Sequence, residues 1–164
     1  MRKIFITIFT ALFLYMNNAE AQLTVSVSSV EVDQNAQATV NVAVNGFTSL
    51  VGVQFSLNYD SLLLDFVSAG NFAATLPNLS SLAVSGPNGV GVKKGQITFS
   101  WFDSQGPGQT LPNGGRLFSI VFATKGAKGS KADITVTSTP RKAEFYGLDL
   151  VEKPVAGVKG TITI

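Results

Sequence analysis

The 164-residue sequence contains no cysteine and no histidine. The lack of cysteine excludes disulfide bonds and thiolate chemistry, and the lack of histidine removes the commonest general base and metal ligand. A glycosidase would need only two carboxylates, but Asp60 and Asp103 each end a predicted strand, where aspartate commonly stabilises a turn. The D-x-[DN]-x-[DN]-G calcium loop is also missing. We therefore predict no catalytic residues, no bound metal and no cofactor.

Charged residues are sparse, at 13% of the chain, and the formal net charge is only +2. The basic residues are scattered, and the one small cluster, Lys125, Lys128 and Lys131, alternates with glycine and serine in a predicted loop. This pattern does not indicate a nucleic-acid partner.

The first 21 residues resemble a secretory signal. Arg2 and Lys3 precede an apolar run at residues 4–15, and the segment closes with an A-x-A pattern before a predicted cleavage after Ala21. The apolar run is too short to cross a bilayer as a helix. We therefore expect an exported protein with no membrane segment after cleavage, extracellular or periplasmic, whose residues 22–164 form a single domain.

The remaining sequence alternates short runs of valine, isoleucine, threonine and phenylalanine with glycine, asparagine, proline and aspartate. This pattern predicts an all-β fold in which nine strands form two packed antiparallel sheets. An irregular segment at 69–95 separates the fourth and fifth strands and contains a weak strand candidate near residues 82–84. The nine predicted strands are residues 23–32, 38–44, 52–60, 62–68, 96–103, 116–124, 133–138, 142–146 and 157–164.

Three of these strands have one apolar row and one row without charge. A period of two places Trp101 in the core and turns Phe102 outward. If the three strands share a sheet, their outer rows form a flat, easily desolvated platform for another protein. The alternative is that segment 69–95 folds back over this surface. The outward rows are Gln54, Ser56 and Asn58; Thr98, Ser100 and Phe102; and Leu117, Ser119, Val121 and Ala123.

The order of several sequence features resembles the cohesin family over nearly the whole of residues 22–164. These features are LVGVQFSLNYDSLLLDFVSAG, then GQITFSWFD, then GGRLFSIVFATKG, and finally GVKGTITI. The resemblance implies a nine-stranded sandwich of jelly-roll topology, related to the folds of carbohydrate-binding modules. It also implies a non-catalytic module that binds the calcium-containing dockerins of secreted polysaccharide-degrading enzymes. Carried over by position, the dockerin-binding residues are Gln54, Ser56, Asn58, Ser100, Phe102, Ser119 and Val121.

Two other functions remain open from the sequence. A carbohydrate-binding module would contact polysaccharide directly through exposed rings, for which Phe47, Phe72, Phe102 and Tyr146 are the candidates. A structural or adhesive surface component is the third hypothesis. The platform also lacks the acidic side chains that many cohesins use, so the family resemblance does not identify a particular dockerin.

Overall fold

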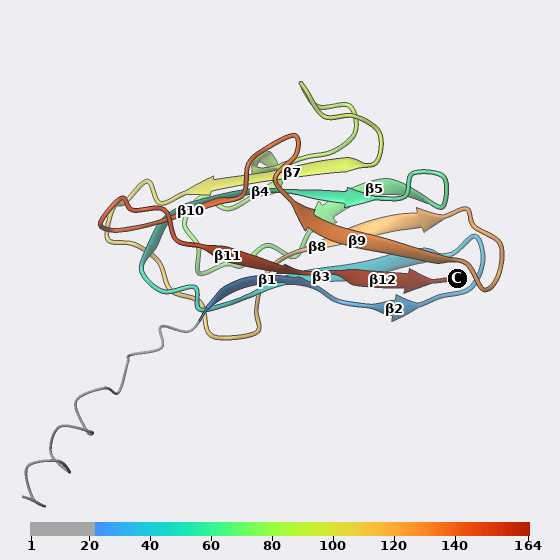
Figure 1. The fold of residues 1–164 in the computed structure, drawn as a ribbon, viewed down its shortest axis with the longest axis horizontal. Coiled ribbons are helices and arrows are strands. Elements are labelled where there is room, and N and C mark those ends of the chain that lie inside the picture. Colours follow the sequence, from blue (N-terminus) through green and yellow to red (C-terminus); the bar gives the residue numbers. More distant parts are fainter. Residues whose placement is uncertain (1–21) are drawn as a thin grey trace, which may run out of the picture.

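The computed structural model describes residues 22–164 as two β-sheets packed face to face (Figure 1). The predicted signal segment, 1–21, lies outside the described residues. In the described part of the chain, no helix is long and apolar enough to cross a membrane. Its only helical element is a single 3-10 turn, η2 (Ser81–Ala83).

The first sheet, called here the back sheet, has the strand order β11-β1-β3-β8-β5. The second, the front sheet, has the order β2-β12-β9-β4-β7-β6, and β10 pairs with β4 beside β9. The back-sheet strands are β1 (Leu23–Val27), β3 (Gln37–Asn45), β5 (Leu64–Gly70), β8 (Gly115–Thr124) and β11 (Val155–Val158). The front-sheet strands are β2 (Val30–Glu31), β4 (Leu50–Tyr59), β6 (Val84–Ser85), β7 (Gln96–Phe102), β9 (Lys131–Thr137), β10 (Glu144–Gly147) and β12 (Gly160–Thr163).

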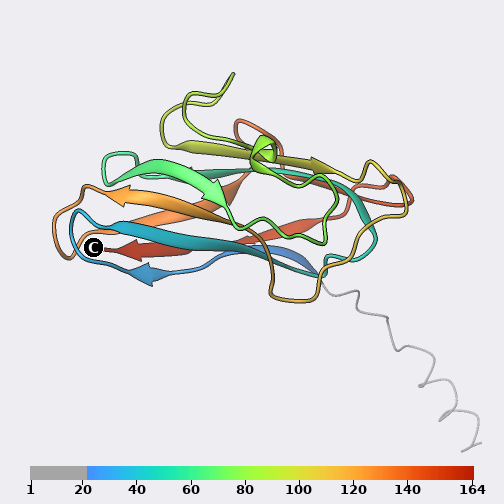
Figure 2. The same ribbon diagram turned by 180° about the vertical axis from the view of Figure 1, so that it is seen from behind.

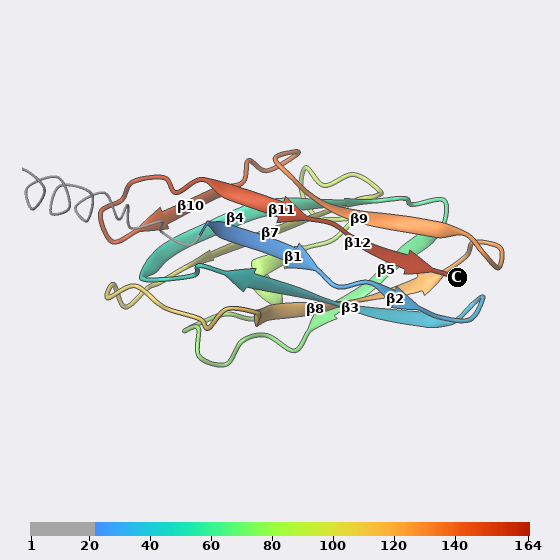
Figure 3. The same ribbon diagram turned by 60° about the horizontal axis from the view of Figure 1, so that its bottom comes forward.

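The all-β sandwich is confirmed, but twelve strands replace the expected nine, and two pairs are parallel. The extra strands arise mainly because two predicted strands each cross from one sheet to the other. The segment 23–32 divides into β1 and β2, and the C-terminal segment divides into β11 and β12. These two segments run side by side and in parallel through both sheets (Figure 3).

Gly160 lies at this crossing and requires the absence of a side chain. A Cβ atom on Gly160 would collide with the backbone carbonyl oxygens of Val27 and Ser28. The two crossing segments can therefore approach closely only with glycine at this position.

The core is formed by the inward rows that the period of two predicts. Val40, Val42 and Val44 are fully buried. Phenylalanines from both sheets stack in the space between the sheets. The ring centroids of Phe55 and Phe99 are 5.0 Å apart, and those of Phe99 and Phe118 are 4.9 Å apart. Offset stacks at such distances favour a well-ordered core.

Two leucine side chains lie elsewhere than the alternation predicts. Leu117 was expected to face outward, but it is fully buried because a bulge in the β3–β8 pairing adds one residue to β8. Leu62 was expected to begin a strand, but it is 82% exposed in the turn that precedes β5. Asp60 holds this turn, because its Oδ1 accepts a hydrogen bond from the Leu62 amide at 2.8 Å.

Candidate functional site

Two of the three strands expected to form the platform are neighbours in the front sheet. Strands β4 and β7 pair in register, with Gln54 opposite Ser100 and Ser56 opposite Thr98. The inward residues of both strands are buried, so the alternate rows point away from the core, although Thr98 in the β7 row is only 6% exposed. The buried residues are Val53, Phe55 and Leu57 of β4 and Ile97, Phe99 and Trp101 of β7.

The third strand, β8, belongs to the back sheet, between β3 and β5 (Figure 2). The prediction that Ser119 and Val121 share a surface with Gln54 and Phe102 is therefore wrong. Ser119 is 3% exposed, and its hydroxyl donates to Asn41 Oδ1 at 2.8 Å. Val121 pairs with Thr39 on the far side of the sandwich. Alternation along a strand shows which residues share a face of that strand, but not which sheet it joins.

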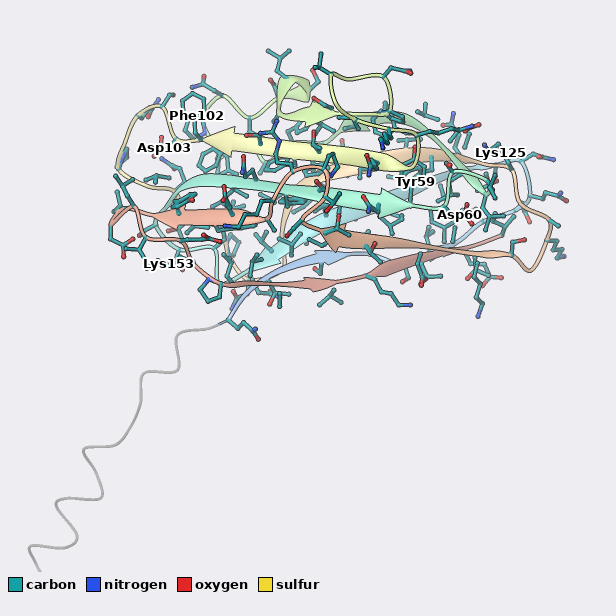
Figure 4. All side chains as sticks on the ribbon, turned by 45° about the horizontal axis from the view of Figure 1, so that its top comes forward. Tyr59, Asp60, Phe102, Asp103, Lys125 and Lys153 are labelled. Atoms are coloured by element: carbon teal, nitrogen blue, oxygen red, sulfur yellow. The ribbon has the colours of Figure 1, made fainter. Side chains whose placement is uncertain are left out.

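A loop of the chain covers the outward row of β4. Residues 138–143 connect β9 to β10, which pair with successive parts of β4, and this loop rises over the front sheet (Figure 4). Ser56 is fully buried beneath it. The Ser56 hydroxyl donates to the Arg141 carbonyl at 2.9 Å and accepts from the Arg141 amide at 2.8 Å.

The residues on either side of Ser56 also contact the loop. The Arg141 guanidinium donates to Gln54 Oε1 at 3.2 Å, and the Gln54 amide donates to Glu144 Oε2 at 2.7 Å. The Asn58 amide donates to the Thr139 carbonyl at 3.1 Å, in the orientation that satisfies both of its polar atoms. The sequence left open that residues 69–95 cover this surface. The cover over β4 comes from residues 138–143, and Val90, Gly91 and Val92 of the segment 69–95 line a pocket with Thr98 of β7 and Arg141 of the loop.

The exposed part of the β4–β7 surface lies at the end where β4 begins and β7 ends. Ser100 is exposed and Phe102 is 70% exposed, at the opposite end of β7 from Tyr59 and Asp60 (Figure 4). Gly52 pairs with Phe102 on one side and with Tyr146 of β10 on the other. Of the four candidate sugar-binding rings, Phe47 is fully buried, Phe72 stacks on Phe118 and Tyr146 is half-buried, so Phe102 alone is largely exposed.

Ion pairs lie along the β10 edge of this surface. Lys142 Nζ lies 2.9 Å from Glu144 Oε1 and 3.0 Å from Glu152 Oε2. These hydrogen bonds, to Glu144 first and then to Glu152, raise the pKa of Lys142 above its ordinary range. Lys142 therefore stays protonated throughout the physiological pH range and offsets part of the charge of the two carboxylates.

Asp103 stabilises the turn that follows β7. Its carboxylate accepts hydrogen bonds from the Gln105 and Gly108 amides, both at 2.9 Å, and from the Gln109 side chain at 3.1 Å. Although desolvation raises the pKa of Asp103, these bonds outweigh it and hold the pKa below its ordinary value. The turn roles expected for Asp60 and Asp103 are confirmed. Among residues 22–164, no three acidic side chains are grouped so that they could hold a metal ion.

Comparison with known proteins identifies the fold and the family. The sequence model of the cohesin domain family matches residues 23–164 of the chain. The chain belongs to the cohesin family. Cohesin domains are non-catalytic binding modules, so this cohesin is not an enzyme. No curated protein sequence matches it.

Solved cohesins share the sandwich of this cohesin at low sequence identity. The sixth cohesin of scaffoldin B from Acetivibrio cellulolyticus, solved with a Cel5 dockerin, is 17% identical, with 88% of this chain and 99% of that chain covered and a TM-score of 0.73. A cohesin from a Clostridium thermocellum Coh-OlpA–Doc918 complex is 18% identical, and the match covers 88% of this chain and 99% of that chain with a TM-score of 0.69. A non-cellulosomal cohesin from the archaeon Archaeoglobus fulgidus is 20% identical, and the match covers 87% of this chain and 90% of that chain with a TM-score of 0.66.

Three features of this cohesin's front sheet were missed in the sequence analysis. The predicted strands 133–138 and 142–146 leave only residues 139–141 between them, whereas the loop spans 138–143, and Gly52 has no predicted role beyond beginning a strand. Tyr146 was considered as a separate exposed ring rather than as a neighbour of Phe102. The strand spacing that brings Phe102, Gly52 and Tyr146 into one row depends on β10 pairing with β4, which no local sequence pattern encodes.

Proposed function

We propose that this cohesin is an extracellular module that recruits dockerin-bearing, polysaccharide-degrading enzymes through its front sheet. Membership of the cohesin family is the observation that carries the proposal. Two of its structural neighbours were solved in complexes with dockerins, which supports the same class of partner. The A. fulgidus neighbour is described as non-cellulosomal, so assembly of a cellulosome is a narrower proposal than dockerin binding.

Of the predicted contact residues, Ser100, Phe102 and Gln54 fit the dockerin interface best. Ser100 and Phe102 are exposed, and Gln54 is half-buried at the border of the loop 138–143. Ser56 and Asn58 lie in the part of the row that the loop occupies. Ser119 and Val121 lie on the back sheet and are not part of the proposed interface.

Binding to dockerins tests the proposal. Recombinant dockerins from the secreted hydrolases of the source organism would be titrated against the purified cohesin, with and without calcium, by isothermal titration calorimetry. We expect at least one dockerin to bind, with a calcium requirement that originates in the dockerin. Phe102→Ala and Ser100→Arg should each weaken binding by about 2 kcal/mol or more, as expected of central interface residues. Absence of binding by every calcium-loaded dockerin would refute the proposal.

Direct polysaccharide binding is the second candidate function. The row that contains Phe102 and Tyr146 favours it, because rings on a flat surface can stack on sugars. Retention of the cohesin on insoluble cellulose or xylan without any dockerin, lost in Phe102→Ala, would support this function. Secretion is tested separately, by finding Gln22 at the N-terminus of the exported protein.

A further inference from the structure

One row across the exposed end of the front sheet consists of two aromatic residues on either side of a glycine. Phe102 of β7 pairs with Gly52 of β4, and Gly52 pairs with Tyr146 of β10. A Cβ atom on Gly52 would lie 3.9 Å from Tyr146 Cδ2, with no other atom of its surroundings within 4 Å. Position 52 therefore has no side chain between the two aromatic residues, and the Tyr146 ring borders the space above it; this position is called here the Gly52 slot.

The slot has the width of two strand spacings, roughly 10 Å between the backbones of Phe102 and Tyr146. None of its three residues is charged. The chain after β10 adds apolar surface at the same end of the sandwich, where β7 and β10 both terminate (Figure 1). Leu148, which is 53% exposed, approaches Gly108 of the turn that follows β7. Leu150 and Val151, in the same segment, are 73% and 55% exposed.

This chemistry fits an aliphatic side chain better than a sugar. A sugar bound between the rings would need hydrogen-bonding partners for its hydroxyl groups. The neighbouring turn presents leucine and valine, and the carboxylate of Glu152, which pairs with Tyr146 through a β-bridge, is already bound to Lys142 at 3.0 Å. The loop 138–143 already occupies the hydrogen-bonding groups of Ser56 and borders those of Gln54. A helix can place one apolar residue between the two rings from the end of β4 and β7 at which Phe102 is exposed.

We propose that the Gly52 slot receives an aliphatic side chain from a helix of the dockerin, and that the missing side chain at position 52 determines which dockerins fit. The inference rests on the proposed function. It moves the centre of the interface from the middle of β4, which the loop covers, to the end of the sheet where β4 begins. Gly52 is thus a specificity-determining position rather than a requirement of the fold.

Filling the slot tests the inference. Gly52→Val adds a side chain where the structure has room for a Cβ, in a strand that accommodates β-branched residues. The matched control is Gly70→Val, because Gly70 faces outward from β5 on the back sheet and a Cβ there meets no atom within 4 Å. Both variants should unfold at a denaturant concentration close to that of the unmodified protein. The measurement is the affinity of each for a dockerin that binds the unmodified protein.

We expect Gly52→Val to lower dockerin affinity about 30-fold or more, in the range of an interface hot spot, and Gly70→Val to leave it unchanged. Equal affinities of the two variants would overturn the inference while the proposed function stands. The failure of any dockerin to bind the unmodified protein would instead overturn the proposed function.

Two further results remain decisive. If Gly52→Val lowers retention on cellulose or xylan but not dockerin affinity, the slot binds a glycan and the inference is wrong. If Gly52→Val does not fold, Tyr146→Ala removes one wall of the slot, and we expect about tenfold weaker dockerin binding. Unchanged affinity of that variant would equally contradict the inference.

Discussion

The hydrogen bonds between Ser56 and Arg141 give the most direct prediction about the loop 138–143. In Ser56→Ala, the loop loses one donor and one acceptor, at 2.9 Å and 2.8 Å from its backbone. Each hydrogen bond contributes a net free energy of about 1 kcal/mol. Because Arg141 is exposed, water can replace part of the loss, so we expect the free energy of unfolding to fall by about 1–2 kcal/mol.

Amide hydrogen exchange measures the local part of this effect. The Arg141 amide donates to Ser56, so its exchange should accelerate about tenfold for each 1.4 kcal/mol of local stability lost. Ser100→Ala is the matched control, because Ser100 lies opposite Gln54 on β7 and is exposed. The control should change the free energy of unfolding by no more than about 0.5 kcal/mol. If both variants behave alike in urea unfolding and in amide exchange, Ser56 does not hold the loop.

Three other perturbations test the fold. Gly160→Ala should lower the free energy of unfolding by about 2 kcal/mol or more, since the added Cβ meets backbone carbonyls; an unchanged thermal midpoint would contradict the close crossing. Trp101→Phe removes the indole N–H that donates to the Pro77 carbonyl at 2.9 Å, and it should lower the free energy of unfolding in urea by about 1–3 kcal/mol. A decrease no larger than that caused by substituting an exposed residue would argue against this hydrogen bond. The pKa of Asp103 is lower in the folded protein than its value of about 3.9 in the unfolded chain. The ionised carboxylate should therefore stabilise the fold at pH values above about 3.9, and this stabilisation should be lost as the pH falls through the folded-state pKa. Asp103→Asn should therefore make acid unfolding less steep below pH ~4, and an identical profile would refute the turn assignment.

The inward rows were predictable from sequence because a period of two depends only on neighbouring residues. Phe55, Phe99 and Phe118 lie in the core as the pattern predicts. Sheet membership depends on contacts between distant segments, which is why β8 was placed with β4. The bulge that buries Leu117 also depends on pairing with β3, so strict alternation failed there.

The uncharged row on β4 has a different physical origin from the one predicted. A surface without charge was interpreted as a docking platform, and at Ser100 and Phe102 this remains the proposal. At Ser56 the absence of charge has a local cause, because a charged side chain fully buried beneath residues 138–143 would lose its hydration. Small polar side chains in a strand can therefore indicate a covering loop as well as a partner.

The crossing segments at the two ends of the domain have a consequence for how the chain folds. Thr161 donates its amide to the Ser29 hydroxyl across 132 residues of sequence, and Ile162 pairs with Val30. Neither β2 nor β12 can complete its pairing before nearly the whole domain has been synthesised. Topologies dominated by such distant pairings fold slowly, on the order of milliseconds to seconds. We therefore expect folding to finish at this seam, where the first and last strands meet.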